Sequence, residues 1–260
     1  MRRCMDGFTL IELVTVIVLM SIVSLAGVEI IRYTADSYDK MMGRQTLGNS
    51  ARIATDRISR ELRAALPGSA RVANDCIEFI PINAAGNYLD IPVETAATSF
   101  QAVPLNPGQA AATGRVAVYP VSSSVYNLAN NILSGNATVG APDGNNEIMV
   151  SMAVAHSFPN ESPNRRFYLV ADPVSYCVDG DNLFRYQNYG VVTTQLSSAG
   201  LPASLPDRAL LVDKVGSSVM PFAVTNVSLQ RNAIVTVDLS FSEDGETINI
   251  LHEVQLRNVP

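Results

Sequence analysis

The sequence predicts an α+β protein in which one long N-terminal helix packs on an antiparallel sheet. Three observations predict this class. An apolar run near the N-terminus leads without proline into an amphipathic stretch that ends at Leu66-Pro67-Gly68. From Cys76 onward, short alternating runs separated by turn residues are typical of strands. The chain of 260 residues is 47% hydrophobic, which is enough for a sizeable core.

The apolar run follows a short basic head, residues 1–7, that contains Arg2 and Arg3. As a helix, residues 8–31 would be about 36 Å long, enough to cross a bilayer core of about 30 Å. A secretory signal peptide has its small-residue cleavage site after the apolar run, whereas here Gly7 precedes it. We therefore expect the segment to stay on the protein as a membrane anchor.

One acid, Glu12, lies inside this apolar run. A carboxylate near the edge of a bilayer core costs roughly 2.5 kcal/mol or more, so such a residue is usually functional and paired. The alternative is an interfacial acid whose side chain reaches the headgroups from a plain anchor.

Residues 32–66 are predicted to continue the same helix as an amphipathic half. Charges at i,i+4 spacing pair Arg52 with Asp56, Asp56 with Arg60, and Arg57 with Glu61. An apolar stripe at helical spacing consists of Leu47, Ala51, Ala54, Ile58, Leu62 and Ala65. This stripe needs a partner, which we expect to be the sheet. A free coiled-coil stalk is the less favoured alternative, because the stripe lasts fewer than about three heptads.

Residues 67–260 are predicted to form the β-rich body. The strand-like runs are CIEFIPI (76–82), RVAVYPV (115–121), EIMVSMAV (147–154), RFYLVAD (166–172), VSYCV (174–178), LFRYQNYGVVTT (183–194) and RALLVDKV (208–215). The last part of the chain predicts a hairpin, with two alternating runs at 233–241 and 248–256 and a turn at 243–246. Residues 94–114 and 121–146 are rich in small and polar residues and predict long surface loops.

The chain has three cysteines, Cys4, Cys76 and Cys177. If the head is removed, an even pair remains, and in an exported domain such a pair predicts a disulfide. Two unrelated buried thiols are the alternative. A metal site is disfavoured, because no CxxC motif or histidine pair accompanies the cysteines.

Charge and motifs disfavour several functions. The formal net charge is −6 and no basic cluster forms a phosphate-binding stripe, so nucleic acid is not expected as a partner. No GxSxG, HExxH or Walker motif is present, so we do not expect an enzyme. Neither His156 nor His252 lies in a catalytic motif, and His252 is expected to be half-buried on a strand face.

No cofactor is expected, although two acidic turns leave calcium open. Residues 179–182 (DGDN) and 143–146 (DGNN) resemble half of a calcium loop but lack its spaced ligands and closing glutamate. A β-hairpin turn explains both runs better, because Asp-Gly and Asn suit positions of positive φ.

The stretch Gly7-Phe8-Thr9-Leu10-Ile11-Glu12 closely resembles the processing site of type IV prepilins and of the pseudopilins of type II secretion. In that family a membrane aspartyl peptidase cuts after the glycine and methylates the new N-terminal amine. The resemblance implies a cleaved leader of residues 1–7 and a mature chain that begins at methylated Phe8. It also implies that Glu12 pairs with the amine of a neighbouring subunit, which would make each buried charge tolerable.

The resemblance also implies a location and partners. Arg2 and Arg3 keep the head cytoplasmic by the positive-inside rule, which leaves the body in the periplasm of a bacterium. The protein would cross the inner membrane once and then enter a pilus or pseudopilus. The implied partners are the prepilin peptidase/N-methyltransferase, the inner-membrane assembly platform, other minor and major pilin subunits, and membrane lipid.

Within the family, ISRELRAALPGSARV followed by CIEFIPI resembles the large minor prepilins of the mannose-sensitive haemagglutinin (MSHA) type IV pilus, which are related to the J-type minor pseudopilin. This resemblance implies a minor subunit that acts in pilus initiation or at the tip. The alternatives are a minor pseudopilin of type II secretion and a membrane-tethered periplasmic binding domain.

Overall fold

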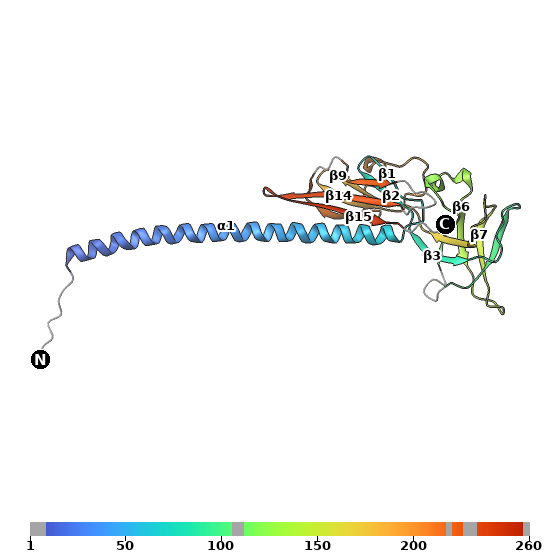
Figure 1. Cartoon of the computed structure of the whole chain (residues 1–260), viewed down its shortest axis with the longest axis horizontal. Coiled ribbons are helices and arrows are strands. Elements are labelled where there is room, and N and C mark those ends of the chain that lie inside the picture. Colours follow the sequence, from blue (N-terminus) through green and yellow to red (C-terminus); the bar gives the residue numbers. More distant parts are fainter. Residues whose placement is uncertain (1–8, 106–111, 217–219, 226–232, 257–260) are drawn as a thin grey trace.

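One helix projects far beyond a body of antiparallel strands joined by turns and loops (Figure 1). This computed structural model describes residues 9–105, 112–216, 220–225 and 233–256. The predicted α+β class, a long apolar helix packed on antiparallel sheets, is confirmed.

Helix α1 spans Leu10–Arg63, 54 residues, and only its second half touches the body. The predicted apolar stripe is confirmed, because all six of its members are buried in the core between α1 and the sheets. Two predicted surface ion pairs are formed, Arg52–Asp56 at 3.9 Å and Arg57–Glu61 at 3.4 Å. Among the described residues, Asp56 and Arg60 do not form the expected ion pair.

The helix ends at Arg63, slightly before the predicted end at Leu66. The backbone N–H of Leu66 donates to the carbonyl of Ile80 at 2.8 Å, so pairing with the sheet competes with the last helical turn. Gly68 follows at φ 71°, and a Cβ there would lie 2.6 Å from the backbone nitrogen of Ser122. This position therefore requires glycine, which the predicted Pro-Gly stop supplies.

The strands of the described residues form three sheets. A five-stranded sheet has the order β1 (Arg71–Ala73), β2 (Cys76–Phe79), β9 (Val174–Asp179), β10 (Asn182–Tyr186), β11 (Arg208–Asp213). In a four-stranded sheet, β14 (Ile234–Glu243) pairs with β12 (Val215–Gly216), β13 (Phe222–Thr225) and β15 (Glu246–Gln255). A six-stranded sheet has the order β3 (Ile82–Asn87), β8 (Arg166–Val170), β5 (Thr113–Val118), β6 (Leu133–Val139), β7 (Ile148–His156), β4 (Ala97–Ala102).

The sheets divide into a proximal and a distal part. The five-stranded and four-stranded sheets share one core with α1, which packs against β14, β15 and β11. The six-stranded sheet lies beyond the end of the helix and encloses a separate core that contains Phe100 and Phe167 (Figure 1). A third cluster, including Leu66, Tyr126 and Tyr168, joins the two parts.

The two predicted surface loops are wrong. Strand β4 lies within 94–114, while β6 and the 3-10 turns Ser123–Tyr126 and Leu128–Asn130 lie within 121–146. Small polar residues give these segments little strand signal of their own, but pairing with β7 and β5 satisfies their backbones. The run 183–194 is also shorter than predicted, because residues with positive φ, Asn188 and Gly190, follow the strand that ends at Tyr186.

The predicted C-terminal hairpin is confirmed. Strands β14 and β15 pair along their full length, and the turn at Asp244 and Gly245 has positive φ at both residues. The alternating face of β15 lies on the helix, and Ile248 reaches within 3.8 Å of a Cβ placed on Gly48. His252 is half-buried on this face, as predicted.

Candidate assembly segment and the body that carries it

The helix begins at the sequence that the resemblance singles out. Thr9 is extended, with φ −80° and ψ 149°, and α1 starts at Leu10. Glu12 therefore lies in the first helical turn, where the N-terminal end of the helix dipole favours a negative charge. The Thr9 hydroxyl donates to Glu12 Oε2 at 3.4 Å. Within the described ranges, no cation forms an ion pair with Glu12.

Gly7 and Phe8 lie outside the described residues. Their roles in cleavage and methylation stay predictions.

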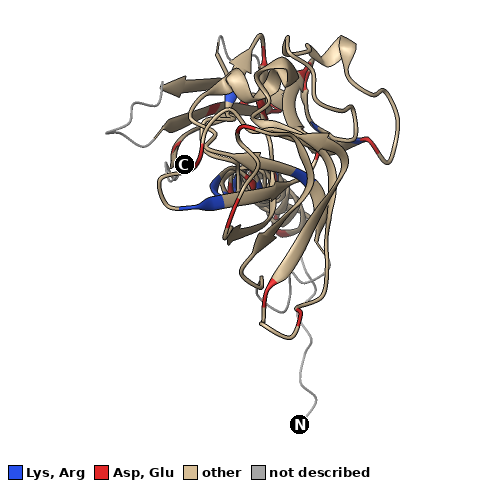
Figure 2. Ribbon diagram, turned by 90° about the vertical axis from the view of Figure 1, so that its right-hand side faces the viewer, with Lys and Arg blue, Asp and Glu red and all other residues tan. Residues whose placement is uncertain are grey.

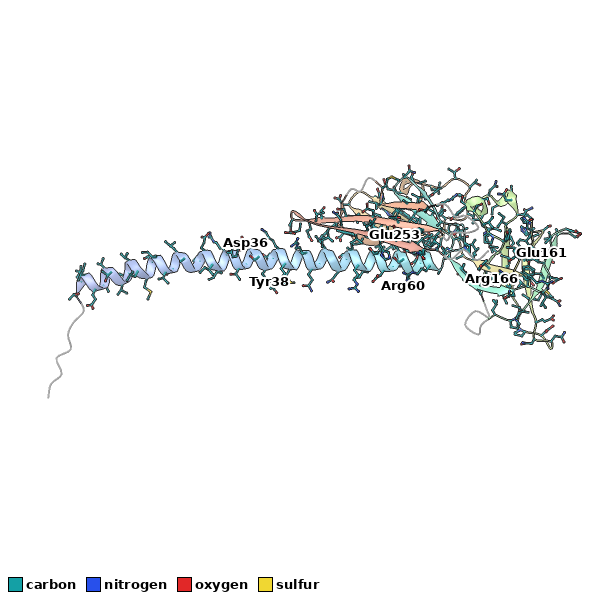
Figure 3. All side chains as sticks on the ribbon, in the orientation of Figure 1. Asp36, Tyr38, Arg60, Glu161, Arg166 and Glu253 are labelled. Atoms are coloured by element: carbon teal, nitrogen blue, oxygen red, sulfur yellow. A yellow bond between two sulfur atoms is a disulfide. The ribbon has the colours of Figure 1, made fainter. Side chains whose placement is uncertain are left out.

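The first half of α1 presents a continuous apolar surface. Its large side chains from Leu10 to Ile31 are all exposed, and the body covers none of them (Figure 3). This is the one stretch of the described chain long and apolar enough to cross a membrane. In a bilayer the exposed surface would be buried in lipid, which is the environment that it suits.

The hydroxyls within this surface are satisfied inside the helix. Ser21 donates to the carbonyl of Ile17 and Ser24 to that of Met20, each at 2.7 Å. Such internal bonds are required where no water is available, because an unsatisfied polar group in lipid costs several kcal/mol. Between Leu10 and Val28, Glu12 is the one charged side chain.

Charged contacts and packing fix the second half of α1 on the body. Arg185 of β10 contacts Glu61 at 3.0 Å, and Arg44 contacts Glu246 of β15 at 2.8 Å. The exposed pair at Arg44 adds little energy, whereas the partly buried Arg185–Glu61 pair sits directly above the apolar stripe.

A buried ion pair organises the body near the helix end. Arg71 Nε of β1 lies 2.6 Å from Glu78 Oε2 of β2, its cross-strand partner. Arg71 also donates to the carbonyls of Thr193 and Val192 at 2.6 and 2.8 Å. Its guanidinium lies 3.5 Å from the centre of the Tyr126 ring, so one arginine joins the proximal sheet to the turn that packs on the distal sheet.

A tyrosine completes this network. The Tyr189 hydroxyl donates to Glu78 Oε1 at 3.2 Å and shares a 2.7 Å hydrogen bond with Ser175. Burial, followed by the negative charge of Glu78, raises the pKa of Tyr189 well above its ordinary value. Sequence patterns do not reveal this network, because Arg71 and Glu78 meet only when β1 pairs with β2.

The structure contains a disulfide between Cys76 and Cys177, which are paired residues on β2 and β9. The bond closes a loop with a sequence separation of 101 and lies beside the buried Tyr186 and Leu201. It links β2, the second strand after the helix, to β9, the strand that follows the distal strand β8 along the chain.

Both acidic runs weighed as calcium loops are turns. Gly180, at φ 60°, lies in the hairpin between β9 and β10, and Asp179 contacts Arg208 at 3.2 Å. Asp143 Oδ1 accepts from the backbone N–H groups of Asn145 and Glu147, each at 2.9 Å. In the described part of the chain, no group of three His, Cys, Asp or Glu side chains is placed to hold a metal.

The comparison with known families returns one motif. Residues 2–28 match the model of the prokaryotic N-terminal methylation motif. No curated protein and no solved structure matches the chain. The match covers the head, the first helical turn and most of the apolar surface, the segment on which the resemblance to prepilins rests.

The motif and the architecture agree on a class of protein. An uncovered apolar helix, continued by an amphipathic half on antiparallel sheets, is a pilin-like architecture. The methylation motif supports a type IV pilin-like or pseudopilin subunit, anchored by its helix, processed by a prepilin peptidase and assembled with other pilins. Proteins with this motif are structural subunits rather than enzymes.

Proposed function

We propose that this protein is a minor type IV pilin-like subunit of an MSHA-type pilus that acts in assembly initiation or at the tip. It is processed after Gly7 and methylated on Phe8, resides in the bacterial inner membrane with its body in the periplasm, and then enters the pilus. It has no enzymatic role and needs no cofactor. Its partners are the processing enzyme, the assembly platform, membrane lipid, and minor and major pilin subunits.

One observation carries the proposal. The exposed apolar half of α1 has a single acid, Glu12, in its first turn, and this turn lies within the part of the chain that matches the methylation motif. Lateral packing of such helices would replace lipid contacts by contacts between subunits. Glu12 would then set the stagger by pairing with the methylated amine of a neighbour, because each charge would be costly in lipid alone. The body, at the other end of the helix, would cap or decorate the fibre.

The substitution Glu12→Val tests this role. The variant should still be cleaved and methylated, since the peptidase acts at Gly7 and Phe8, but should enter pili poorly. Immunoblots of sheared pili, normalised to the membrane pool, measure incorporation. Glu29→Gln, a change on the same exposed helix, is the matched control and should incorporate normally. Normal incorporation of the Glu12 variant would refute the proposed pairing.

Intact mass separates the proposal from a simple membrane tether. The membrane-extracted chain should lack residues 1–7 and carry one added methyl group. A full-length, unmethylated chain would favour a tethered binding domain. A type II secretion pseudopilin shares this processing, so it is distinguished by deletion: loss of piliation supports the proposal, and loss of secretion supports the pseudopilin.

A further inference from the structure

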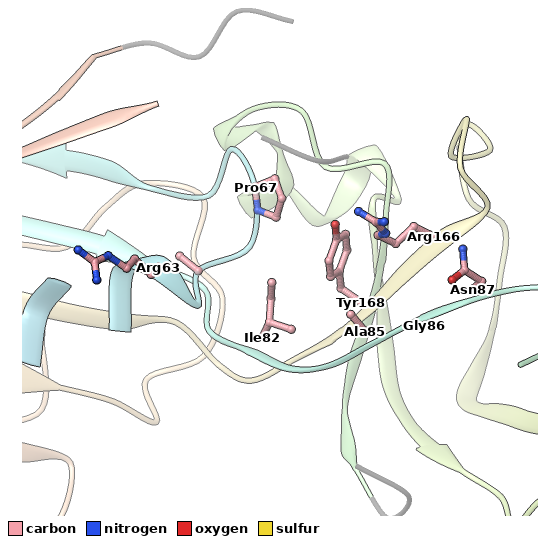
Figure 4. Close-up of a pocket in the computed structure, with 9 residues that line it drawn as sticks. Arg63, Pro67, Ile82, Ala85, Gly86, Asn87, Arg166 and Tyr168 are labelled. Carbon is pink, nitrogen blue, oxygen red and sulfur yellow. The ribbon is translucent and has the colours of Figure 1, made fainter. Parts of the chain in front are cut away.

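A cleft of about 430 Å³ lies between the end of α1 and the distal sheet (Figure 4). Its floor consists of two cross-strand pairs of β3 and β8, Ala85 with Tyr168 and Asn87 with Arg166. Arg63, in the last turn of α1, lies on the opposite side. The small side chain of Ala85 beside a tyrosine leaves the floor hollow.

The cleft is positively charged. Two arginines line it and no acidic residue does. Within the described ranges, neither the Arg63 nor the Arg166 side chain forms an ion pair or hydrogen bond. The negative end of the helix dipole accounts for a cation at Arg63. It does not account for Arg166, which is partly buried on a strand. Other partly buried arginines of the body, Arg71 and Arg185, do have acidic partners.

The cleft also runs along an open strand edge. Strand β3 is at the end of its sheet, and among the described residues only the two ends of its free edge make backbone hydrogen bonds outside the sheet. At one end Ile82 N–H donates to the carbonyl of Ala64 at 3.0 Å, and at the other Val103 N–H donates to the carbonyl of Asn87 at 2.9 Å. The backbone carbonyl of Asn87 points to this free edge. Backbone groups of alternate residues in a strand point to the same side, so the N–H and C=O of Ala85 also point to the free edge, between its two hydrogen-bonded ends.

We infer that this cleft binds an extended acidic segment of a partner polypeptide, which adds beside β3 and places carboxylates on Arg63 and Arg166. Guanidinium groups bind carboxylates through paired hydrogen bonds, and a free strand edge binds an extended backbone. The combination selects a peptide over a simple anion. The inference depends on the proposed function only in that the partner would be another subunit of the assembly.

A synthetic peptide tests the site on the full-length protein in detergent. The probe is a fluorescein-labelled Thr-Glu-Val-Glu-Val-Glu-Thr peptide, and fluorescence anisotropy measures its binding. Arg166→Gln and Arg63→Gln should each weaken binding about tenfold or more, the usual effect of losing a charged hydrogen bond. Arg52→Gln is the matched control, because that side chain is 83% exposed on the same helix outside the cleft. Equal thermal unfolding midpoints would show that the variants are folded.

Two altered probes test the two parts of the inference. A peptide with Gln in place of Glu should lose binding to the arginines, and one N-methylated at its central residue should lose strand pairing. Equal binding of either probe, or unchanged binding by both arginine variants, would overturn the inference. Displacement by millimolar inorganic phosphate, with no effect of N-methylation, would indicate a simple anion site and overturn it as well. An Arg166-dependent dimer of the protein alone, seen by sedimentation, would overturn the inference in favour of a second copy as the occupant of the cleft. None of these results depends on processing at Gly7, which intact mass measures separately.

Discussion

Replacing Arg71 with alanine should strongly destabilise the body. The pair that it forms with Glu78 is buried, with side chains 13% and 1% exposed. Removing one partner of such a pair leaves an uncompensated charge and costs about 3 to 5 kcal/mol. For a body of this size, each kcal/mol lowers the midpoint by roughly 2 to 4 °C, so we expect a fall of about 6 to 20 °C. Circular dichroism of the full-length protein in detergent measures the midpoint.

The matched control is Arg44→Ala. Arg44 contacts Glu246 at 2.8 Å but is 66% exposed, so its loss should cost about 1 kcal/mol or less. The double variant Arg71→Met with Glu78→Leu should recover part of the loss, because it leaves no unpaired charge. If Arg71→Ala and Arg44→Ala shift the midpoint equally, burial does not determine the value of these pairs and the reasoning is refuted.

Three further predictions concern the core, the disulfide and pH. Ile58→Ala should lower the free energy of unfolding, measured with urea, by about 2 to 5 kcal/mol, because Ile58 is fully buried on the helix stripe. The control Ile53→Ala, at a site 64% exposed, should lower it little, and equal losses in the two variants would contradict the packing. Reduction of Cys76–Cys177 should lower the free energy of unfolding by on the order of 4 kcal/mol, and an unchanged unfolding midpoint with reductant would argue against the bond as a stabilising link. Because the pKa of Tyr189 is raised in the folded state, the unfolded chain loses that proton first, and stability should fall as the pH rises above about 10. Tyr189→Phe should make this fall shallower between about pH 9 and 11, and an equal slope would refute the assignment.

The helix was predictable almost in full because its signals are local. The apolar run, the stripe from Leu47 to Ala65 and the Pro67-Gly68 stop all depend on residues within a few positions of one another. The C-terminal hairpin was predictable for the same reason. Its alternation and its Asp-Gly turn lie in one short stretch.

The distal sheet was predictable only in part. The runs at 115–121, 147–154 and 166–172 correctly predicted β5, β7 and β8, whereas β4 and β6 depend on distant neighbours. Strand β6 has small polar residues and pairs with β5 and β7, and β4 pairs with β7 rather than with the strand before it. Small and polar residues at 94–114 and 121–146 suggested loops, yet these segments contribute β4 and β6 to the sheet. Figure 2, which faces the distal end of the molecule, shows strands that are mostly uncharged. Uncharged polar residues suit exposed strand faces as well as they suit loops.

The sequence by itself determined the long anchor helix, the place of Glu12 within it and the motif that precedes it. It predicted the Cys76–Cys177 bond but left two separate thiols as an alternative, which the structure decided. Only the tertiary structure decided that the body has two cores, that Arg71 meets Glu78, and that Arg63 and Arg166 face one cleft. The physical reason is the range of the interactions. Helix and hairpin patterns repeat within a few residues, whereas strand pairing and charge pairing join residues whose separation along the chain carries no information about their contact.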